Sequence, residues 1–217
     1  MTNQVDTLHV HQYPSRERMG AAAAAVVAEA VDRLLSSKEH ISIIFGSAPS
    51  QNEFLDALVR KPIAWDRVTA FHMDEYIGLP RTAPESFSYY LKSRLFDVVG
   101  FRAVHTIDGA AADPDAECAR YAQLLSTHGL DITCMGIGEN GHIAFNDPHV
   151  ALFDDPDRVK VVELDQACRQ QQVNDGCFAD ISLVPRRAGA VRARNGRIPA
   201  DTDNQPAVAL SQKSIHY

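Results

Sequence analysis

The sequence lacks several patterns that would each define a class of protein. Its four cysteines, Cys118, Cys134, Cys168 and Cys177, are dispersed without a Cys-x-x-Cys pair. We therefore expect reduced thiols packed in the interior rather than a disulfide framework. There is also no His-Glu-x-x-His or Gly-x-Ser-x-Gly pattern. Their absence argues against a metal hydrolase and a serine hydrolase, and we expect no metal site.

Positive charge and long apolar runs are also scarce. The formal net charge is −7 and the sequence pI is about 5.7, whereas nucleic-acid binding requires a basic surface, so we expect no nucleic-acid partner. No apolar run approaches the roughly 20 residues that cross a bilayer. The N-terminus MTNQVDTLHVHQ lacks the basic-then-apolar order of a signal peptide. We expect a cytoplasmic protein with no membrane partner.

The composition that remains is that of a globular α/β protein, with 45% apolar and 23% charged residues. Apolar, β-branched runs predict strands at 40–45, 67–73, 104–107, 131–135 and 159–164. Helix-forming stretches with capping residues predict helices at 16–37, 50–58, 84–98, 113–126 and 165–173. This alternation predicts a mainly parallel sheet with helices on both faces, a Rossmann-like three-layer sandwich. Ligands of such sheets bind beyond the carboxyl ends of the strands, so we expect the chemistry after Phe45, Met73 and Met135.

The segment from Pro185 to Tyr217 has a different character. It contains five arginines, no Phe or Trp, and no clear helical or strand period. We therefore predict an α/β domain at 1–184 and an atypical, mobile tail at 185–217.

The first candidate site is the turn Gly46-Ser47-Ala48, which lies between a predicted strand and a predicted helix. Backbone N–H groups in such a turn, together with a helix N-terminus, can bind a phosphate. An ordinary strand-to-helix turn has the same composition, so both interpretations stay open.

The second candidate is the carboxylate pair Asp74 and Glu75, which ends an apolar strand. Neighbouring side chains of an extended chain point in opposite directions, so we expect only one of the two to face a ligand. That carboxylate would be a general base if burial tunes its pKa. A cap for the next element or a surface ion pair is the alternative.

The third candidate is the glycine-rich segment from Gly136 to Pro148. An imidazole, His142, lies between amide and carboxylate side chains that can fix its tautomer. A purely structural histidine is the alternative interpretation.

Two of these segments, FHMDEYIGLP with APESFSYYL and then MGIGENGHIAFNDP, resemble in order and separation the glucosamine-6-phosphate isomerase/deaminase family, which is related to the 6-phosphogluconolactonases. The resemblance extends from about residue 26 to about residue 184 and includes VKVVELDQACRQQQVNDGCF. It implies an enzyme that converts an amino-sugar phosphate into a ketose phosphate and ammonia, with a small-molecule sugar phosphate as its partner and no organic cofactor.

The resemblance also implies residue roles. Asp74 resembles the aspartate that moves a proton between C2 and C1, and His142 resembles the histidine that opens the sugar ring. Asp147 stands where the family often has Glu. Gly46 and Ser47 resemble the phosphate loop.

The chain departs from the family pattern in four places. Asn140 stands where many members have an Asp partner for the histidine, and Ala48 replaces a hydroxyl residue of the phosphate loop. Gln172 stands where a phosphate-binding Arg is often found, and Arg169 on the same helix face is the substitute we expect. After about residue 184 the family continues with further strands and helices, so the resemblance implies truncation or an altered reading frame and the loss of late strands.

Three functions remain from the sequence. The DEYIGL stretch favours the deaminase over a 6-phosphogluconolactonase-like hydrolase in which His142 activates water. The third is a sugar-phosphate-binding protein or fragment that has lost catalysis. A homo-oligomer is left open.

Overall fold

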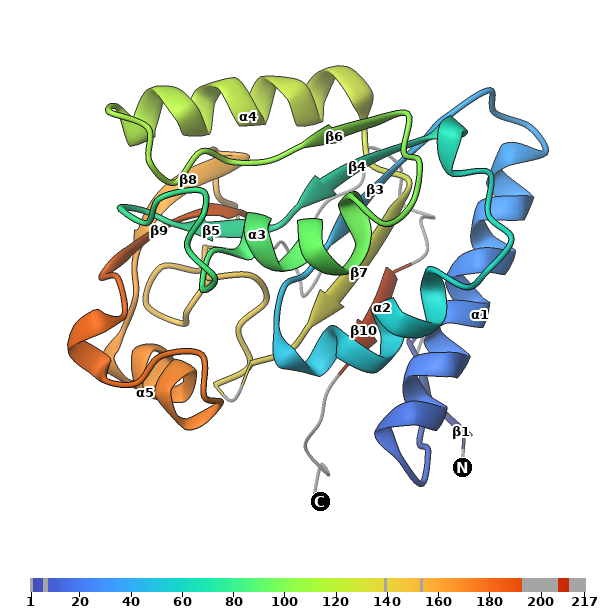
Figure 1. Cartoon of the computed structure of the whole chain (residues 1–217), viewed down its shortest axis with the longest axis horizontal. Coiled ribbons are helices and arrows are strands. Elements are labelled where there is room, and N and C mark those ends of the chain that lie inside the picture. Colours follow the sequence, from blue (N-terminus) through green and yellow to red (C-terminus); the bar gives the residue numbers. More distant parts are fainter. Residues whose placement is uncertain (1, 6–7, 139, 153, 193–206, 211–217) are drawn as a thin grey trace.

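The computed structural model describes residues 2–5, 8–138, 140–152, 154–192 and 207–210 of the chain. Strands and helices alternate along it and form a mixed α/β fold (Figure 1). The first strands, β1 (Thr2–Val5) and β2 (Leu8–His11), pair with each other as an antiparallel hairpin. The sheet that carries the fold follows them.

The main sheet has five parallel strands in the order β10-β7-β3-β4-β6. They are β3 (Ile41–Phe45), β4 (Val68–His72), β6 (Ala103–His105), β7 (Ile132–Gly136) and β10 (Ala207–Leu210). Every residue of β3 and β4 is buried. Their apolar runs suit strands that are covered on both faces, and they confirm the predicted parallel sheet.

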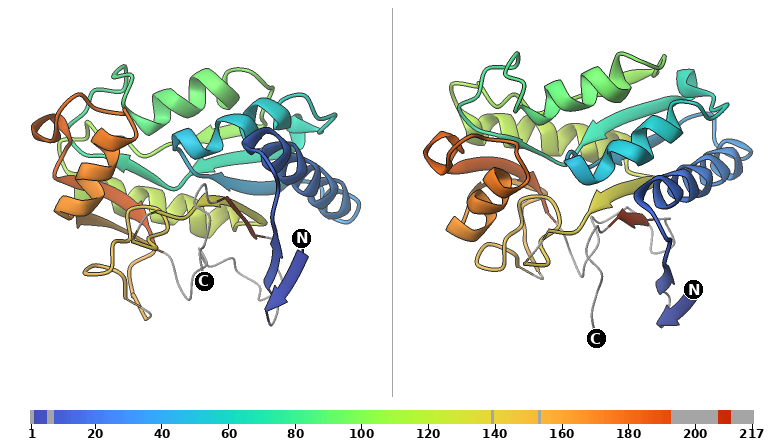
Figure 2. Two further views of the ribbon diagram at one scale, coloured as in Figure 1. Left: turned by 90° about the horizontal axis from the view of Figure 1, so that it is seen from below. Right: turned by 60° about the horizontal axis from the view of Figure 1, so that its bottom comes forward.

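Helices cover both faces of this sheet (Figure 2). The helices on one face are α1 (Arg16–Leu35), α2 (Asn52–Leu58) and α3 (Phe87–Leu91), and α4 (Pro114–His128) covers the other. Successive residues of β3 divide between the two layers: Ile43 packs with the α1 and α2 side chains, and Ile44 packs with those of α4. This alternation is what a strand between two helical layers requires.

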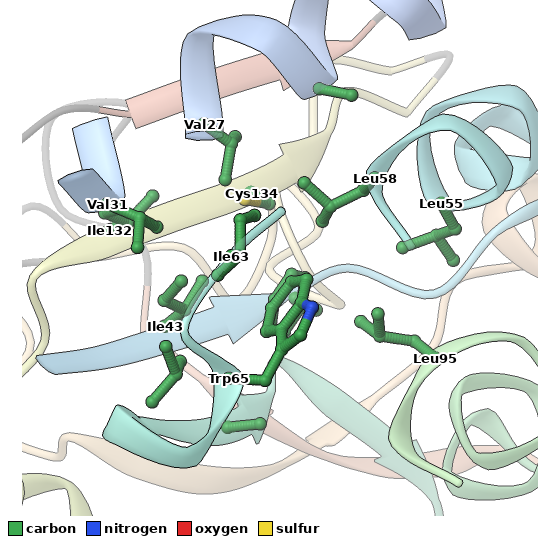
Figure 3. Close-up of a cluster of buried hydrophobic side chains, with 14 of the residues drawn as sticks. Val27, Val31, Ile43, Leu55, Leu58, Ile63, Trp65, Leu95, Ile132 and Cys134 are labelled. Carbon is green, nitrogen blue, oxygen red and sulfur yellow. The ribbon is translucent and has the colours of Figure 1, made fainter. Parts of the chain in front are cut away.

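The core beneath α1 and α2 is built mainly from aliphatic side chains around Trp65 (Figure 3). Trp65 comes from η2 (Trp65–Arg67), the short helix that leads into β4. The ring of Trp65 meets Phe101 edge to face, with the ring centroids 4.8 Å apart. α1 approaches α2 closely at Gly20, where a Cβ would lie 2.6 Å from the backbone carbon of Glu53.

Capping residues explain where the longer helices begin. Ser15 accepts from the Arg18 N–H at the start of α1, and Asp113 accepts from the Ala116 N–H at the start of α4. The predicted helix at 84–98 is α3 followed by the π-helix η3 (Lys92–Phe96). The sequence predicts that the helix at 50–58 begins with a capping box of Ser50 and Glu53, which is wrong. The short helix η1 (Pro49–Gln51) comes first, and Glu53 accepts instead from the Arg16 guanidinium, at 2.7 and 2.8 Å.

A second, antiparallel sheet lies beside the main one, in the order β5-β9-β8. Its strands are β5 (Asp74–Tyr76), β8 (Val159–Glu163) and β9 (Arg187–Val191). The chain therefore does not place its strand at 159–163 in the parallel sheet. α5 (Gln166–Asn174) packs here around a core that includes Tyr76 and Phe145, and η4 (Ile181–Leu183) lies against α5.

The start of the predicted tail belongs to the fold. β9 is the central strand of the second sheet, with Ala188, Ala190 and Val191 buried, so a mobile tail beginning at Pro185 is wrong for 185–191. The small residues of this strand fit between β5 and β8. Its sequence lacks the run of β-branched residues that predicts a strand. Further on, β10 pairs with β7. Residues 193–206 and 211–217 lie outside the described residues, and for them the tail stays a prediction.

Among the described residues, no helix is long and apolar enough to cross a membrane.

Candidate active site

Three loops meet at the carboxyl ends of the adjacent strands β7, β3 and β4. The Met73 N–H donates to the Phe45 carbonyl at 3.1 Å, and the Gly46 N–H donates to the Cys134 carbonyl at 2.7 Å. The chain after Phe45, Met73 and Met135 is therefore gathered at one edge of the sheet, as the alternating pattern predicts.

Asp74 is the first residue of β5 and is almost completely buried, with 6% of its surface exposed. Burial raises the pKa of its carboxyl group well above the ordinary value, and the nearby charge of Glu75 raises it further. A hydrogen bond from the Phe145 backbone offsets part of this rise. The carboxyl group is thus tuned toward the range in which it can both accept and return a proton.

Glu75, the neighbouring residue, serves the fold. Its carboxylate accepts from the N–H groups of Tyr76 and Phe87 at 3.0 Å, and from the Ser88 N–H and the Ser86 hydroxyl at 2.8 Å. Three of these donors lie at the start of α3, so Glu75 caps that helix. The two carboxylates therefore have different environments, as strand alternation predicts.

His142 lies in the loop after β7, with 11% of its side chain exposed. Its Nδ1 is 2.7 Å from Asn140 Oδ1 and 3.1 Å from Asp147 Oδ1. Both partners are acceptors, so Nδ1 donates and Nε2 is the nitrogen left for proton transfer. The loop therefore fixes the tautomer of the imidazole.

Asp147 supplies the carboxylate partner that the Asn at position 140 cannot. The Asn140 amide instead bridges the two, because its Oδ1 faces His142 and its Nδ2 donates to Asp147 Oδ1 at 2.9 Å. Asp147 is fully buried. Burial raises the pKa of Asp147, but hydrogen bonds from His142 and Asn140 outweigh it and leave the pKa below the ordinary value.

Glycine at position 138 makes room for the imidazole. A Cβ on Gly138 would lie 2.3 to 2.6 Å from three atoms of the His142 ring, closer than any side chain tolerates. The Gly138 N–H also donates to the His142 carbonyl at 2.9 Å. The ring is thus packed directly on the backbone of its own loop.

Val191, at the end of β9, joins the two loops that hold Asp74 and His142. Its N–H donates to the Met73 carbonyl at 2.9 Å, and its carbonyl accepts from Asn146 Nδ2 at 2.8 Å. Sequence reasoning missed this link, because Val191 lies in the segment predicted to be a tail and a backbone contact leaves no side-chain signal.

The predicted phosphate loop is only partly available for binding. The Gly46 N–H is already bonded to Cys134, and the Ala48 carbonyl accepts from the Tyr90 hydroxyl at 2.8 Å. Ser47 is 8% exposed, and its Oγ has no hydrogen-bond partner among the described residues. A buried hydroxyl without a partner is unusual and suits a donor to a bound group.

Arg169 is engaged elsewhere. Its guanidinium donates to the carbonyls of Ile181 at 2.5 Å and Val184 at 3.0 Å, and so ties α5 to η4. Gln172, on the same helix, is buried. These contacts give Arg169 a structural role and do not support it as a substitute phosphate ligand.

The sequence predicts no metal site, yet two groups of side chains have the spacing of metal ligands. In each, the ligand atoms lie within 4.8 Å of one another: His142, Asp147 and Cys168 form one group, and Asp147, His149 and Asp165 form the other. In the first group, the contact of His142 Nδ1 with Asp147 Oδ1 at 3.1 Å accounts for the proximity of those two side chains.

A cavity of about 420 Å³ lies beyond the end of β5 and α4. It is lined by Ile77, Gly78, Pro80, Gly109, Ala110, Ala111, Ala112, Pro114 and Arg187. Its lining includes neither Asp74 nor His142. The candidate site is therefore the edge of the sheet at the carboxyl ends of the strands, and not this cavity.

Comparison with known proteins identifies relatives of the chain. A family model described as glucosamine-6-phosphate isomerases/6-phosphogluconolactonase matches residues 14–172. A glucosamine-6-phosphate deaminase of an Exiguobacterium species is 44% identical over 121 residues, which are 56% of this chain and 46% of the relative. A second, from Streptococcus pyogenes serotype M1, is 31% identical over 157 residues, which are 72% of this chain and 64% of the relative. The chain thus spans about half to two-thirds of these relatives.

Solved structures share the fold. A monomeric glucosamine-6-phosphate deaminase superimposes with a TM-score of 0.74 at 28% identity, over 84% of this chain and 75% of that one. A 6-phosphogluconolactonase from Thermotoga maritima has a TM-score of 0.64 at 15% identity, over 80% of this chain and 73% of that one, which is a likeness of fold alone.

Proposed function

The chain belongs to the glucosamine-6-phosphate isomerase/6-phosphogluconolactonase family, and from this membership we propose that it converts an amino-sugar phosphate into a ketose phosphate and ammonia. The observation that carries the proposal is that the loop of residues 140–147 is connected to both groups that we assign to proton transfer, His142 and Asp74. This loop holds the imidazole of His142 against Asp147, and Asn146 in it is linked through the Val191 backbone to Met73, the residue before Asp74.

His142 is the group we assign to ring opening. Its Nε2 takes the proton from the O1 hydroxyl of the sugar and gives it to the ring oxygen, so that the C1–O5 bond breaks and C1 becomes a carbonyl carbon. The Asp147 carboxylate, 3.1 Å from Nδ1, stabilises the imidazolium that forms in between. Asn140 keeps the ring in the plane of that hydrogen bond.

Asp74 is the group we assign to the isomerisation. It removes the proton from C2, next to the new carbonyl, and returns it to C1. O1 gains a proton and the C2 ammonium group loses one in the same conversion, which leaves a hydroxyl group at C1 and an iminium at C2. Water then adds to C2, the C–N bond breaks, and ammonia leaves behind a ketone. A buried carboxyl group with a raised pKa suits this use, because the same group must accept and then release one proton.

Ser47 is the side chain we assign to the phosphate. Its buried Oγ has no hydrogen-bond partner within the part of the chain that the structure describes. Ser47 follows the end of β3, next to β4, where the hydroxyl can donate to a phosphate oxygen. Ala48 offers only its backbone, so we expect weaker phosphate binding than a loop with a second hydroxyl would give.

The test is to supply glucosamine 6-phosphate to the purified chain and to measure ammonia and ketose phosphate together. Equal amounts of both would support the proposal. Hydrolysis of 6-phosphogluconolactone without ammonia release would favour the hydrolase instead. Binding of the sugar phosphate by calorimetry, with neither reaction, would favour a binding protein that has lost catalysis. The homo-oligomer left open by the sequence remains a prediction, and the similar deaminase structure is described as monomeric.

A further inference from the structure

Cys168 is a buried thiol beside the carboxylate that faces His142. It lies in the first turn of α5 and is 1% exposed. Its backbone N–H donates to Asp165 Oδ1 at 2.5 Å. Asp165 is thus the N-cap of α5, and this bond fixes the position of the Cys168 backbone. Sequence reasoning treated this cysteine as packing alone.

The Asp147 carboxylate is held from two sides. On one side, Asn140 and His142 contact Oδ1. From the start of α5, the Asp165 N–H donates to Oδ2 at 3.3 Å, and the Cys168 sulfur lies within 4.8 Å of a carboxylate oxygen. Among the described residues, the other titratable groups close to Asp147 include the exposed His149 and the Asp165 carboxyl group, each within 4.8 Å of it.

We propose that Cys168 is a positioning residue, whose S–H group holds the Asp147 carboxylate so that Oδ1 faces Nδ1 of His142. Its catalytic consequence rests on the proposed function, whereas the link from Cys168 to Asp147 does not. The first turn of α5 thereby supports the imidazole through one intervening carboxylate.

A protonated thiol suits this place. Burial raises the pKa of Cys168, and the charge of Asp147 raises it further, so the group stays neutral and acts as a donor. Asp147 is fully buried. A neutral donor such as the Cys168 thiol stabilises the carboxylate without adding a second charge to the interior.

The link can be tested without substrate, by titrating the Asp147 carboxyl carbon by ¹³C NMR in the full chain. Cys168→Ala and Cys168→Val both remove the donor, and Val keeps most of the volume should Ala destabilise the fold. We expect the pKa of Asp147 to rise by about half a pH unit or more in both, because a hydrogen bond to its charged form is lost. Cys168→Ser keeps a donor and should titrate like the wild type.

The matched control is Cys118→Ala, which removes a buried thiol from the core beside α4 and should leave Asp147 unchanged. In ammonia release, we expect kcat to fall by about tenfold in Cys168→Val with KM unchanged, and to recover in Cys168→Ser. If the wild type releases no ammonia, the proposed function fails while the titration still decides the role of Cys168. An Asp147 titration in Cys168→Ala and Cys168→Val that matches the wild type would overturn the proposal.

Discussion

Asn146 Nδ2 donates to the Val191 carbonyl at 2.8 Å, across 45 positions of the chain. The Val191 N–H in turn donates to the carbonyl of Met73, the residue before Asp74, at 2.9 Å. Val191 therefore joins the loop that carries His142 to the segment that carries Asp74. Such preorganisation is what proton transfer at two positions of one sugar requires.

Replacing Asp74 with Asn should abolish turnover while leaving sugar-phosphate binding nearly intact. The amide keeps the shape of the carboxyl group but cannot accept a proton, and loss of a general base typically costs about 10²- to 10⁴-fold in rate. Ammonia release and calorimetric binding, measured on the same preparation, provide the check. Asp66→Asn, the same change on an exposed residue, is the control. Near-normal ammonia release by Asp74→Asn would exclude Asp74 as the base.

The same variant should be more stable than the wild type, and increasingly so as the pH rises. The pKa of Asp74 is raised in the folded state, so its stabilising contribution is present below about pH 4 and is lost as the pH rises through the folded pKa. Asn carries no such penalty. In melting curves from pH 4 to pH 8 we expect the gain in Tm to grow with pH, by about 2 to 4 °C for each kcal/mol. A gain that is independent of pH would contradict this reading.

Gly138→Ala should damage activity far more than stability. The added methyl group would overlap the His142 ring, and this exposed loop can yield by moving the ring away from Asp147. We expect turnover to fall by about 10²-fold, because a displacement of about 1 Å in a catalytic group has that effect. Gly100→Ala is the matched control, since nothing lies within 4 Å of its added Cβ. Equal activities in the two variants would show that the ring position does not matter.

Asn140→Asp should not increase ammonia release, although it introduces the residue that the family resemblance implies at this position. The new carboxylate would stand where an amide donates to Asp147 at 2.9 Å, so a hydrogen bond becomes a repulsion between like charges. We expect about 1 kcal/mol of lost stability at pH 7, since position 140 is exposed and solvent screens part of the effect. The loss should shrink as the pH falls and the pair takes up a proton. Denaturant unfolding at pH 7 and pH 4 tests the sign, and a loss that grows toward low pH would be the opposite result.

Glu75→Gln should destabilise the fold without touching the chemistry directly. Three backbone N–H groups and one hydroxyl donate to this carboxylate, and the Gln amide nitrogen would face donors rather than acceptors. We expect a loss of about 2 to 4 kcal/mol, which urea unfolding measures. Glu39→Gln, with a side chain that is 88% exposed, should change stability by less than about 0.5 kcal/mol. A similar small change in Glu75→Gln would show that the cap contributes little.

Local patterns predict much of this structure. The apolar runs of β3, β4 and β7 and the caps Ser15 and Asp113 place their elements to within a few residues, because these signals act within one turn or one strand. The alternation of side chains along a strand also predicts different environments for Asp74 and Glu75, and of the two Glu75 caps α3. The local pattern also indicates amide and carboxylate partners for His142, but not that Asn140 and Asp147 both meet the same ring nitrogen.

Long-range contacts explain the errors. β9 consists of RAGAV, whose arginine and small residues resemble a loop, yet strands pair with it on both sides. The bond of Asn146 to Val191 spans 45 positions, and no period or motif in a single sequence indicates it. The contact of Cys168 with Asp147 is hidden for the same reason.

β9 also decides when the site can exist during synthesis. β5, which carries Asp74, pairs with β9, and the end of β9 joins the Met73 and Asn146 loops. A ribosome makes β5 early, but the strand must wait unpaired until residues 187–191 emerge more than 100 residues later. The parallel strands β3, β4 and β7 are all complete by residue 136, so they can assemble first. We expect nascent chains halted before β9 to hold a folded α/β layer with an unformed site.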